Sequence, residues 1–216
     1  MRRTLIALAL SAAGLAQAAT VSVYTTLAGW EAAISGSAQL QDFSSYAGGT
    51  DLTGVAVLPG LTLSSNLGAV EVFGADKTVF AFGPARLAGN AYYEAQLALP
   101  FLAAALDITA FEANPLEPST AQDDGVLSFL FSDGSSSNLA VAGGDGSPIF
   151  IGIVSDIAIT SFRWNEAHEA GNVNEESGLD NLRVAMRAPG TSELPLPGTL
   201  SLAVLALGAL PLARRR

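Results

Sequence analysis

The chain has 216 residues, with ten Lys and Arg against twenty Asp and Glu, and it has no cysteine. The lack of cysteine excludes disulfides, thiol catalysis and thiolate metal sites. All twenty acidic residues but only five basic ones lie between positions 19 and 193, so this part carries a net charge of −15. This excess of negative charge argues against nucleic acid and anionic lipid as partners, and favours cations or simple solubility outside the cell.

The first eighteen residues are typical of a secretory signal peptide. Two arginines precede an apolar run over residues 5–15, and Ala16 and Ala18 supply the small residues of an A-x-A cleavage site. The apolar run is too short for a stable membrane span. We therefore expect export by the general secretion machinery and a mature chain that begins at Ala19.

The mature part begins with one strand and one helix. Residues 21–24 alternate like a strand, and the apolar spacing then becomes helical over residues 26–34. Thr26 is a candidate N-cap. The residues expected on the buried face of this helix are Leu27, Trp30, Ala33 and Ile34.

The rest of the mature part is predicted to be strands separated by Gly, Asp, Ser and Pro. Three prolines lie between the predicted strands, at Pro59, Pro84 and Pro100. At these positions the missing backbone N–H removes no hydrogen bond between strands. Asp133-Gly134 between two apolar runs is a hairpin signal. The predicted strands cover residues 54–58, 61–64, 69–73, 78–82, 92–99, 104–111, 126–131, 138–142, 149–154, 157–164 and 182–186.

This pattern predicts one all-β domain over residues 19–187, an antiparallel β-sandwich of jelly-roll-like type with a short N-terminal helix. We expect Ile157, Ile159 and Ser161 to point to one side of their strand. Aromatic residues at strand spacing are expected in the core rather than on a sugar-stacking platform. They are Phe129, Phe131, Phe150, Phe162 and Trp164.

Motifs that carry catalysis are few. His168 is the single histidine, and its surroundings lack the second histidine of H-E-x-x-H. A G-x-S-x-G element is missing, and the glycines at 143–146 lack the ending of a phosphate loop. We expect a solvated loop histidine, a turn at 143–146 and a protein that is not an enzyme.

An acidic stretch over residues 165–180 is the one candidate metal site. Glu166, Glu169, Glu175, Glu176 and Asp180 are interleaved with asparagines. Oxygen ligands at close spacing suit calcium, although the spacing is not that of an EF-hand. We expect a solvated loop and no cofactor. The alternatives are a calcium site formed by Glu175, Glu176 and Asp180, and a glycosidase-like pair of acids.

The C-terminal segment, residues 194–216, comes after a polar linker at 188–193. Sixteen uncharged residues over 198–213 would form a helix of about 24 Å, short for a hydrocarbon core of about 30 Å. Pro195 and Pro197 precede this run. It ends in Arg214, Arg215 and Arg216, which predict a cytoplasmic end by the positive-inside rule.

This segment resembles the PEP-CTERM sorting segment of Gram-negative bacteria, which has a Pro-x-Pro signature, a short apolar helix and terminal arginines. The signature here is Pro195-Leu196-Pro197, with leucine where the commonest form has glutamate. The resemblance implies recognition by an exosortase-type transpeptidase in the inner membrane. It also implies a periplasmic domain that is later moved to the cell surface or the medium.

The mature part also resembles the sandwich domain often found in PEP-CTERM proteins, in short pieces only. The pieces are the helix around Trp30 and residues 42–43, 59–63, 109–111, 131–134, 150–153, 159–162 and 178–183. In that family the molecular function of this domain is mostly undefined.

Three other readings of the tail remain open. A plain transmembrane anchor would need no processing. A sortase signal requires threonine at the fourth position of Leu-Pro-x-Thr-Gly, where residues 194–198 have proline. A glycolipid-anchor signal would suit the small residues at 190–192, but its tail should end without arginines.

We therefore expect a non-enzymatic, exopolysaccharide-associated protein of the envelope or extracellular matrix. The alternative is a carbohydrate-binding module with an optional calcium ion, using exposed aromatics such as Tyr92 and Tyr93. A hydrolase with paired acids is a third reading, and it requires two carboxyl groups to converge in a pocket.

Overall fold

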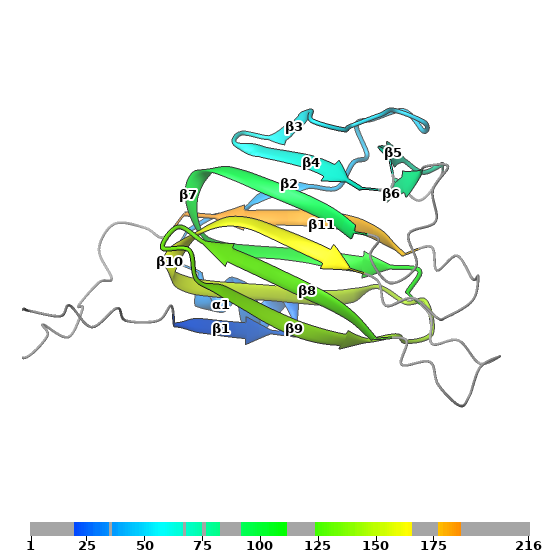
Figure 1. The fold of residues 1–216 in the computed structure, drawn as a ribbon. Coiled ribbons are helices and arrows are strands. Elements are labelled where there is room, and N and C mark those ends of the chain that lie inside the picture. The colour runs from blue at the N-terminus through cyan, green and yellow to red at the C-terminus, as the bar shows by residue number, and fades with distance from the viewer. Residues whose placement is uncertain are drawn as a thin grey trace, which may run out of the picture.

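The computed structural model describes residues 20–34, 36–66, 68–74, 77–82, 92–111, 124–165 and 177–186. These residues form eleven strands and one helix, and every pair of named strands is antiparallel (Figure 1). The elements are β1 (Val21–Tyr24), α1 (Leu27–Ala33), β2 (Gln39–Gln41), β3 (Ala56–Leu58), β4 (Leu61–Ser65), β5 (Ala69–Val72), β6 (Val79–Phe82), β7 (Tyr92–Thr109), β8 (Asp124–Phe131), β9 (Ser136–Ala142), β10 (Ile149–Asn165) and β11 (Gly178–Ala185).

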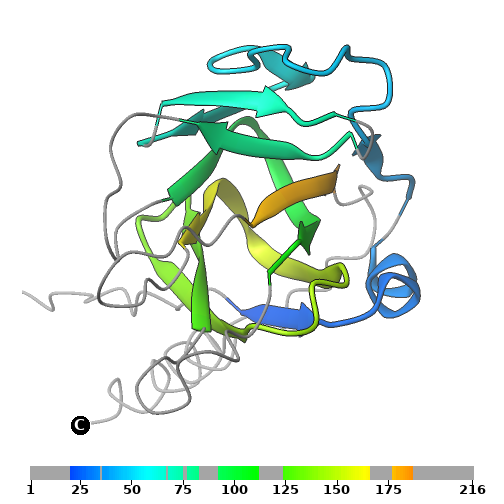
Figure 2. The same ribbon diagram turned by 90° about the vertical axis from the view of Figure 1, so that its right-hand side faces the viewer.

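Two long strands, β7 and β10, join two sheets into one sandwich-like unit. The first half of β7 pairs with β4 and with the second half of β10, which also pairs with β8. The second half of β7 pairs with β11 and with the first half of β10, which also pairs with β1. We call these the β4–β8 sheet and the β11–β1 sheet. Figure 2 shows the strands around a common centre, with α1 outside them.

The space between the sheets holds the main apolar core. Phe129, Phe131, Phe162 and Trp164 are buried there, as predicted. The Trp164 ring meets Phe111 edge to face, with centroids 5.1 Å apart. Phe150 instead contacts a second cluster on the outer surface of the β11–β1 sheet.

The expectation that residues 92–99 and 104–111 form separate strands is wrong, because β7 runs through Pro100. Pairing of β7 with β10 is interrupted between Gln96 and Phe101, where β7 passes from one sheet to the other. A proline at this crossing removes no ladder hydrogen bond. Residues 149–154 and 157–164 likewise belong to the single strand β10, which crosses near Ser155.

A β-bulge at Thr160 overturns the expected side-chain alternation of β10. Ile159 pairs with Phe131 and Ser161 with Leu130, so two steps along β10 match one step along β8. Ile159 is buried in the core, whereas the bulge moves Ser161 to the outer surface. The prediction that Ile159 and Ser161 share one side is therefore wrong.

The short helix forms as expected and covers the outer surface of the β11–β1 sheet. Thr26 is its N-cap, and its Oγ1 accepts a hydrogen bond from the Gly29 N–H at 3.3 Å. The fully buried Trp30 donates from Nε1 to the Ile153 carbonyl at 3.0 Å. Its indole lies over small residues of the sheet, which are Ala103, Ala105, Gly152 and Ala185.

No helix among the described residues is long and apolar enough to cross a membrane. The expected signal peptide (1–18), linker (188–193) and apolar run (198–213) lie outside the described residues. The Asp133-Gly134 hairpin forms as predicted, and the Gly134 N–H donates to the Phe131 carbonyl at 2.9 Å. Strand β2 was not predicted, because three residues with two glutamines carry too little apolar pattern.

The contact between Gly152 and Trp30 leads to a first prediction. A Cβ at Gly152 would lie 2.5 Å from Trp30 Cδ1, so Gly152→Ala must displace the indole. We expect a loss of about 1–3 kcal/mol in the free energy of unfolding, measured by urea denaturation with tryptophan fluorescence. Gly144→Ala is the control, since its nearest atom would be 3.9 Å away. Equal stability of the two variants would contradict the proposed packing.

Candidate functional site

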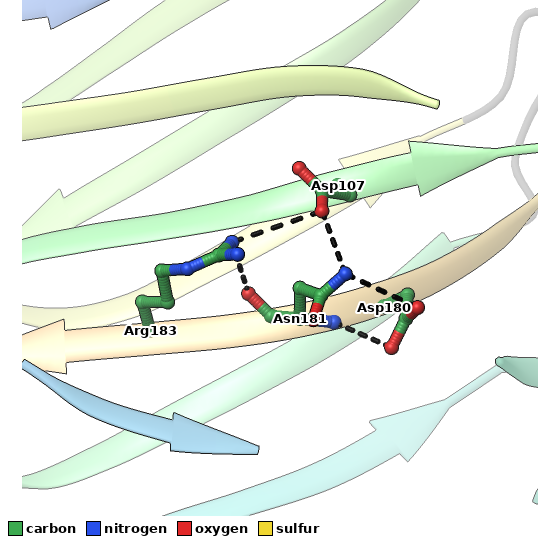
Figure 3. Close-up of polar contacts among 4 residues, drawn as sticks. All are labelled: Asp107, Asp180, Asn181 and Arg183. Carbon is green, nitrogen blue, oxygen red and sulfur yellow. Dashed lines mark hydrogen bonds and ion pairs between the residues drawn. The ribbon is translucent and has the colours of Figure 1, made fainter. Parts of the chain in front are cut away.

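The most polar feature of the β11–β1 sheet is a bulge in β11. Asp180 pairs with Asp107 of β7, but Arg183 pairs with Ala105, so β11 has one residue more than β7 between these points. The extra residue is accommodated at Asn181, whose φ of 50° is left-handed. Asparagine is among the few residues other than glycine that adopt this conformation readily. The bulge brings Asp180, Asn181 and Arg183 beside Asp107 (Figure 3).

Asn181 bridges the two carboxylates. Its Nδ2 donates to Asp107 Oδ2 at 2.8 Å and to Asp180 Oδ2 at 3.2 Å. Its backbone N–H donates to Asp180 Oδ1 at 2.6 Å. Asn181 thus places a hydrogen-bond donor at oxygens of both carboxylates, which are close enough to repel one another. We call Asp107, Asp180, Asn181 and Arg183 the bulge network.

Arg183 supplies the positive charge of the bulge network. Its Nη1 donates to the Asn181 carbonyl at 2.8 Å and lies 3.7 Å from Asp107 Oδ2. The side chains of Arg183 and Asp107 are only 11% and 15% exposed, so little solvent screens this pair. The guanidinium carbon also lies 5.7 Å from the centre of the Phe150 ring. Three groups therefore contact the Arg183 guanidinium: a backbone carbonyl, a carboxylate and an aromatic ring.

The environment of Asp180 disfavours its ionised form. Burial is the largest cause, and the carboxylates of Asp107 and Asp42 act in the same direction. The Asn181 backbone N–H and the Arg183 charge oppose them, and the result is a pKa of Asp180 raised to about 6. The bulge network can therefore take up a proton just below neutral pH. The same two carboxylates could instead share a cation in place of that proton.

The structure describes one residue of the expected calcium site. Asp180 belongs to the bulge network, whereas Glu175 and Glu176 lie outside the described residues, as do Glu166, His168 and Glu169. Within the described ranges, no three His, Asp or Glu side chains are grouped so as to hold a metal ion. The expected cleavage and sorting residues also lie outside these ranges, and they are Ala16, Ala18, Pro195, Pro197, Arg214, Arg215 and Arg216.

Sequence reasoning singled out Asp180 with Asn181 beside it, but it missed Asp107 and Arg183 as partners. Asp107 lies in the middle of β7, and 74 positions separate it from Asn181. The one local signal was the Asp-Asn pair just before the strand predicted at 182–186, because both residues favour bulges and turns over regular strands.

The two tyrosines expected to be exposed differ sharply. Tyr93 is 5% exposed, and its hydroxyl donates to the Ser177 carbonyl at 2.6 Å, so the expectation of an exposed ring is wrong. Tyr92 is partly exposed and stacks beneath the guanidinium of Arg163, whose carbon is 4.0 Å from the ring centre. Neighbouring residues of a strand face opposite sides, so both rings could not have been exposed on one surface.

The raised pKa of Asp180 predicts a pH dependence of stability. The pKa of Asp180 is about 6 in the folded chain, against an ordinary 3.8, so the folded chain holds this proton more tightly than the unfolded chain does. The resulting stabilisation is complete below pH 3.8 and is lost as the pH rises through about 6. Between pH 4 and 6.5 the free energy of unfolding should fall relative to Asp180→Asn, by about 1 kcal/mol after allowance for solvent screening. Urea denaturation across this range measures the difference.

The control for this measurement is Asp133→Asn. The hydroxyl and N–H of Ser135 lower the pKa of Asp133, so its contribution has the opposite sign and grows as the pH rises. Parallel pH profiles for the wild type and Asp180→Asn would contradict the assignment of the titration to Asp180.

The bulge network combines two carboxylates, one amide and one guanidinium on two central strands, so one negative charge is left uncompensated when both carboxylates are ionised. Comparison of the chain with known protein families, curated proteins and solved structures finds no match. The described geometry supports the uptake of a proton by Asp180 at this place on the β11–β1 sheet.

Proposed function

We propose that this chain is an exported, non-enzymatic protein of the envelope or extracellular matrix, associated with exopolysaccharide and sorted through its C-terminal segment. The observation that carries the proposal is Pro195-Leu196-Pro197 before sixteen uncharged residues and three terminal arginines. The expected signal peptide at 1–18 favours the same orientation, since it would export the domain while the arginines keep the other end of the chain cytoplasmic.

The strand boundaries support a folded domain held between two signals. β1 begins at Val21, close after the expected cleavage at Ala18, and β11 ends at Ala185, before the linker at 188–193. The linker would then be free to enter a processing enzyme in an extended form. We interpret the sandwich as jelly-roll-like, because β7 and β10 each serve both sheets.

In this scheme the domain folds in the periplasm while residues 198–213 hold it at the inner membrane. An exosortase-type transpeptidase then cleaves near Pro195 and Pro197. The protein moves to the cell surface or the medium. A span of sixteen residues is shorter than the roughly 20 of a typical anchor, which suits a temporary attachment.

Replacing Pro195 and Pro197 by alanine tests the sorting proposal. The unprocessed chain should accumulate several-fold in the membrane fraction, as measured by intact mass in each cell fraction. Ser192→Ala in the linker is the control and should be processed normally. Normal release of the proline variant would contradict the proposal.

A carbohydrate-binding module with a calcium ion is the second candidate function. The observation that favours calcium is the half-buried carboxylate of Asp180 beside Asp107, since calcium prefers such oxygen ligands. Glu175 and Glu176 precede Asp180 by a few residues and would complete the ligand set. The ion would neutralise carboxylates that repel one another.

Titration calorimetry of the full chain with calcium chloride tests this second candidate. We expect binding in the wild type, and at least tenfold weaker binding in Asp180→Asn and in Glu175→Gln, because each loses one charged ligand. Asp133→Asn, in the β8–β9 hairpin, is the matched control and should bind as the wild type does. Equal affinities of all variants would exclude Asp180 as a ligand.

A further inference from the structure

The outer surface of the β4–β8 sheet is ordered into rows that cross its strands. Ser161 of β10 pairs with Gln96 of β7 and with Leu130 of β8, and Gln96 pairs with Thr62 of β4. These four side chains form one continuous row. It exists because the bulge at Thr160 turns Ser161 outward.

A second row runs beside the first across the same strands. Arg163 pairs with Glu94 and with Ser128, and Glu94 pairs with Ser64. Arg163 Nη2 donates to Glu94 Oε2 at 3.0 Å, and its guanidinium lies over the Tyr92 ring. The Arg163 guanidinium is therefore held by two contacts, the ion pair with Glu94 and the stacking on the Tyr92 ring.

The first row lies in a hollow of ≈ 370 Å³ that is open to solvent. Gly60 and Thr62 line it on one side, Glu94 and Gln96 in the middle, and Leu130 on the other side. Small-molecule sites typically have volumes of about 300–1,000 Å³. The hollow thus has the size of a binding site for one or two small ring units. We call it the β4–β8 hollow.

The β4–β8 hollow has unused hydrogen-bonding groups. Among the residues that the structure describes, Thr62, Gln96 and Ser161 make no side-chain hydrogen bond. Together they present two hydroxyls and one amide, each able to donate and to accept. The Leu130 side chain, 44% exposed, adds an apolar contact at the end of the row. A ligand with both hydroxyls and a C–H face would match these groups.

Charge distinguishes this surface from the rest of the domain. Glu94 and Arg163 neutralise one another and are the only charged residues of the two rows. The surrounding mature chain has a net charge of −15. An acidic polymer would be repelled by the domain, and a cation would find no uncompensated carboxylate in the hollow.

We propose that the β4–β8 hollow binds a neutral polysaccharide, with Thr62, Gln96 and Ser161 bonding its hydroxyls and Leu130 contacting the C–H face of a sugar ring. The proposal deepens the second candidate function and rests on it, because it assigns the glycan site and the class of glycan. The site lies on a different sheet from the bulge network, so glycan binding here needs no calcium.

The test is retention of the full chain on insoluble polysaccharides, in a polyoxyethylene detergent that carries no sugar. The neutral probes are cellulose, curdlan, amylose resin and insoluble mannan, and alginate beads are the acidic probe. Each is used with calcium chloride and with a chelator. We expect retention on at least one neutral probe in both conditions.

Two variants place the site. Gln96→Ala combined with Ser161→Ala should weaken retention at least tenfold, because two hydrogen bonds to the glycan are lost. Thr62→Ala should weaken it less. Ser22→Ala, an exposed serine of β1 in the other sheet, is the control and should bind as the wild type. None of these side chains is in the core, so thermal unfolding should stay unchanged.

Each other outcome has a distinct meaning. Retention on alginate alone would overturn the argument from charge. If the wild type is retained on a neutral probe and the double variant is retained equally well, the proposed location is wrong, while carbohydrate binding itself stands. No retention on any probe would end both. A wild-type dimer that the double variant dissociates in sedimentation experiments would show that a second copy occupies the hollow.

Discussion

The sandwich depends on the continuity of β7 and β10 through both sheets. Because each strand pairs with different neighbours in its two halves, neither sheet can be assembled without the other. This constraint links the sheets as disulfides do in many exported domains, in a chain without cysteine. It also explains where irregular residues are tolerated, since Pro100 lies at a crossing that requires no ladder hydrogen bond.

Both proposed binding surfaces are products of single inserted residues. The bulge in β11 turns Asp180 and Asn181 toward Asp107, and the bulge at Thr160 turns Ser161 toward Gln96. A regular strand would have placed one member of each group on the opposite face. The two surfaces differ in chemistry: one is a half-buried cluster of opposite charges, and the other is an open polar row without net charge.

Local chemistry was enough to predict α1 with its Thr26 cap, the Asp133-Gly134 hairpin and four of the five aromatic core positions, all except Phe150. These features depend on residues a few positions apart. The crossings of β7 and β10 from one sheet to the other could not be predicted. A proline or a polar residue in a strand marks either a strand end or a crossing, and only the pairing with distant strands decides between the two. The contact between Asp107 and Asn181 could not be predicted for the same reason, because it spans 74 positions and depends on a register shift that no short motif encodes.

The position of β11 has a mechanical consequence. This strand is the last described strand of the chain and lies inside its sheet, between β7 on one side and β2 and β6 on the other. A force applied along β11 from its C-terminal end would load its ladders in shear, so that many backbone hydrogen bonds share the force at once. An edge strand loaded in the same direction would have a ladder on one side only, whereas β11 shares the force between ladders on both sides.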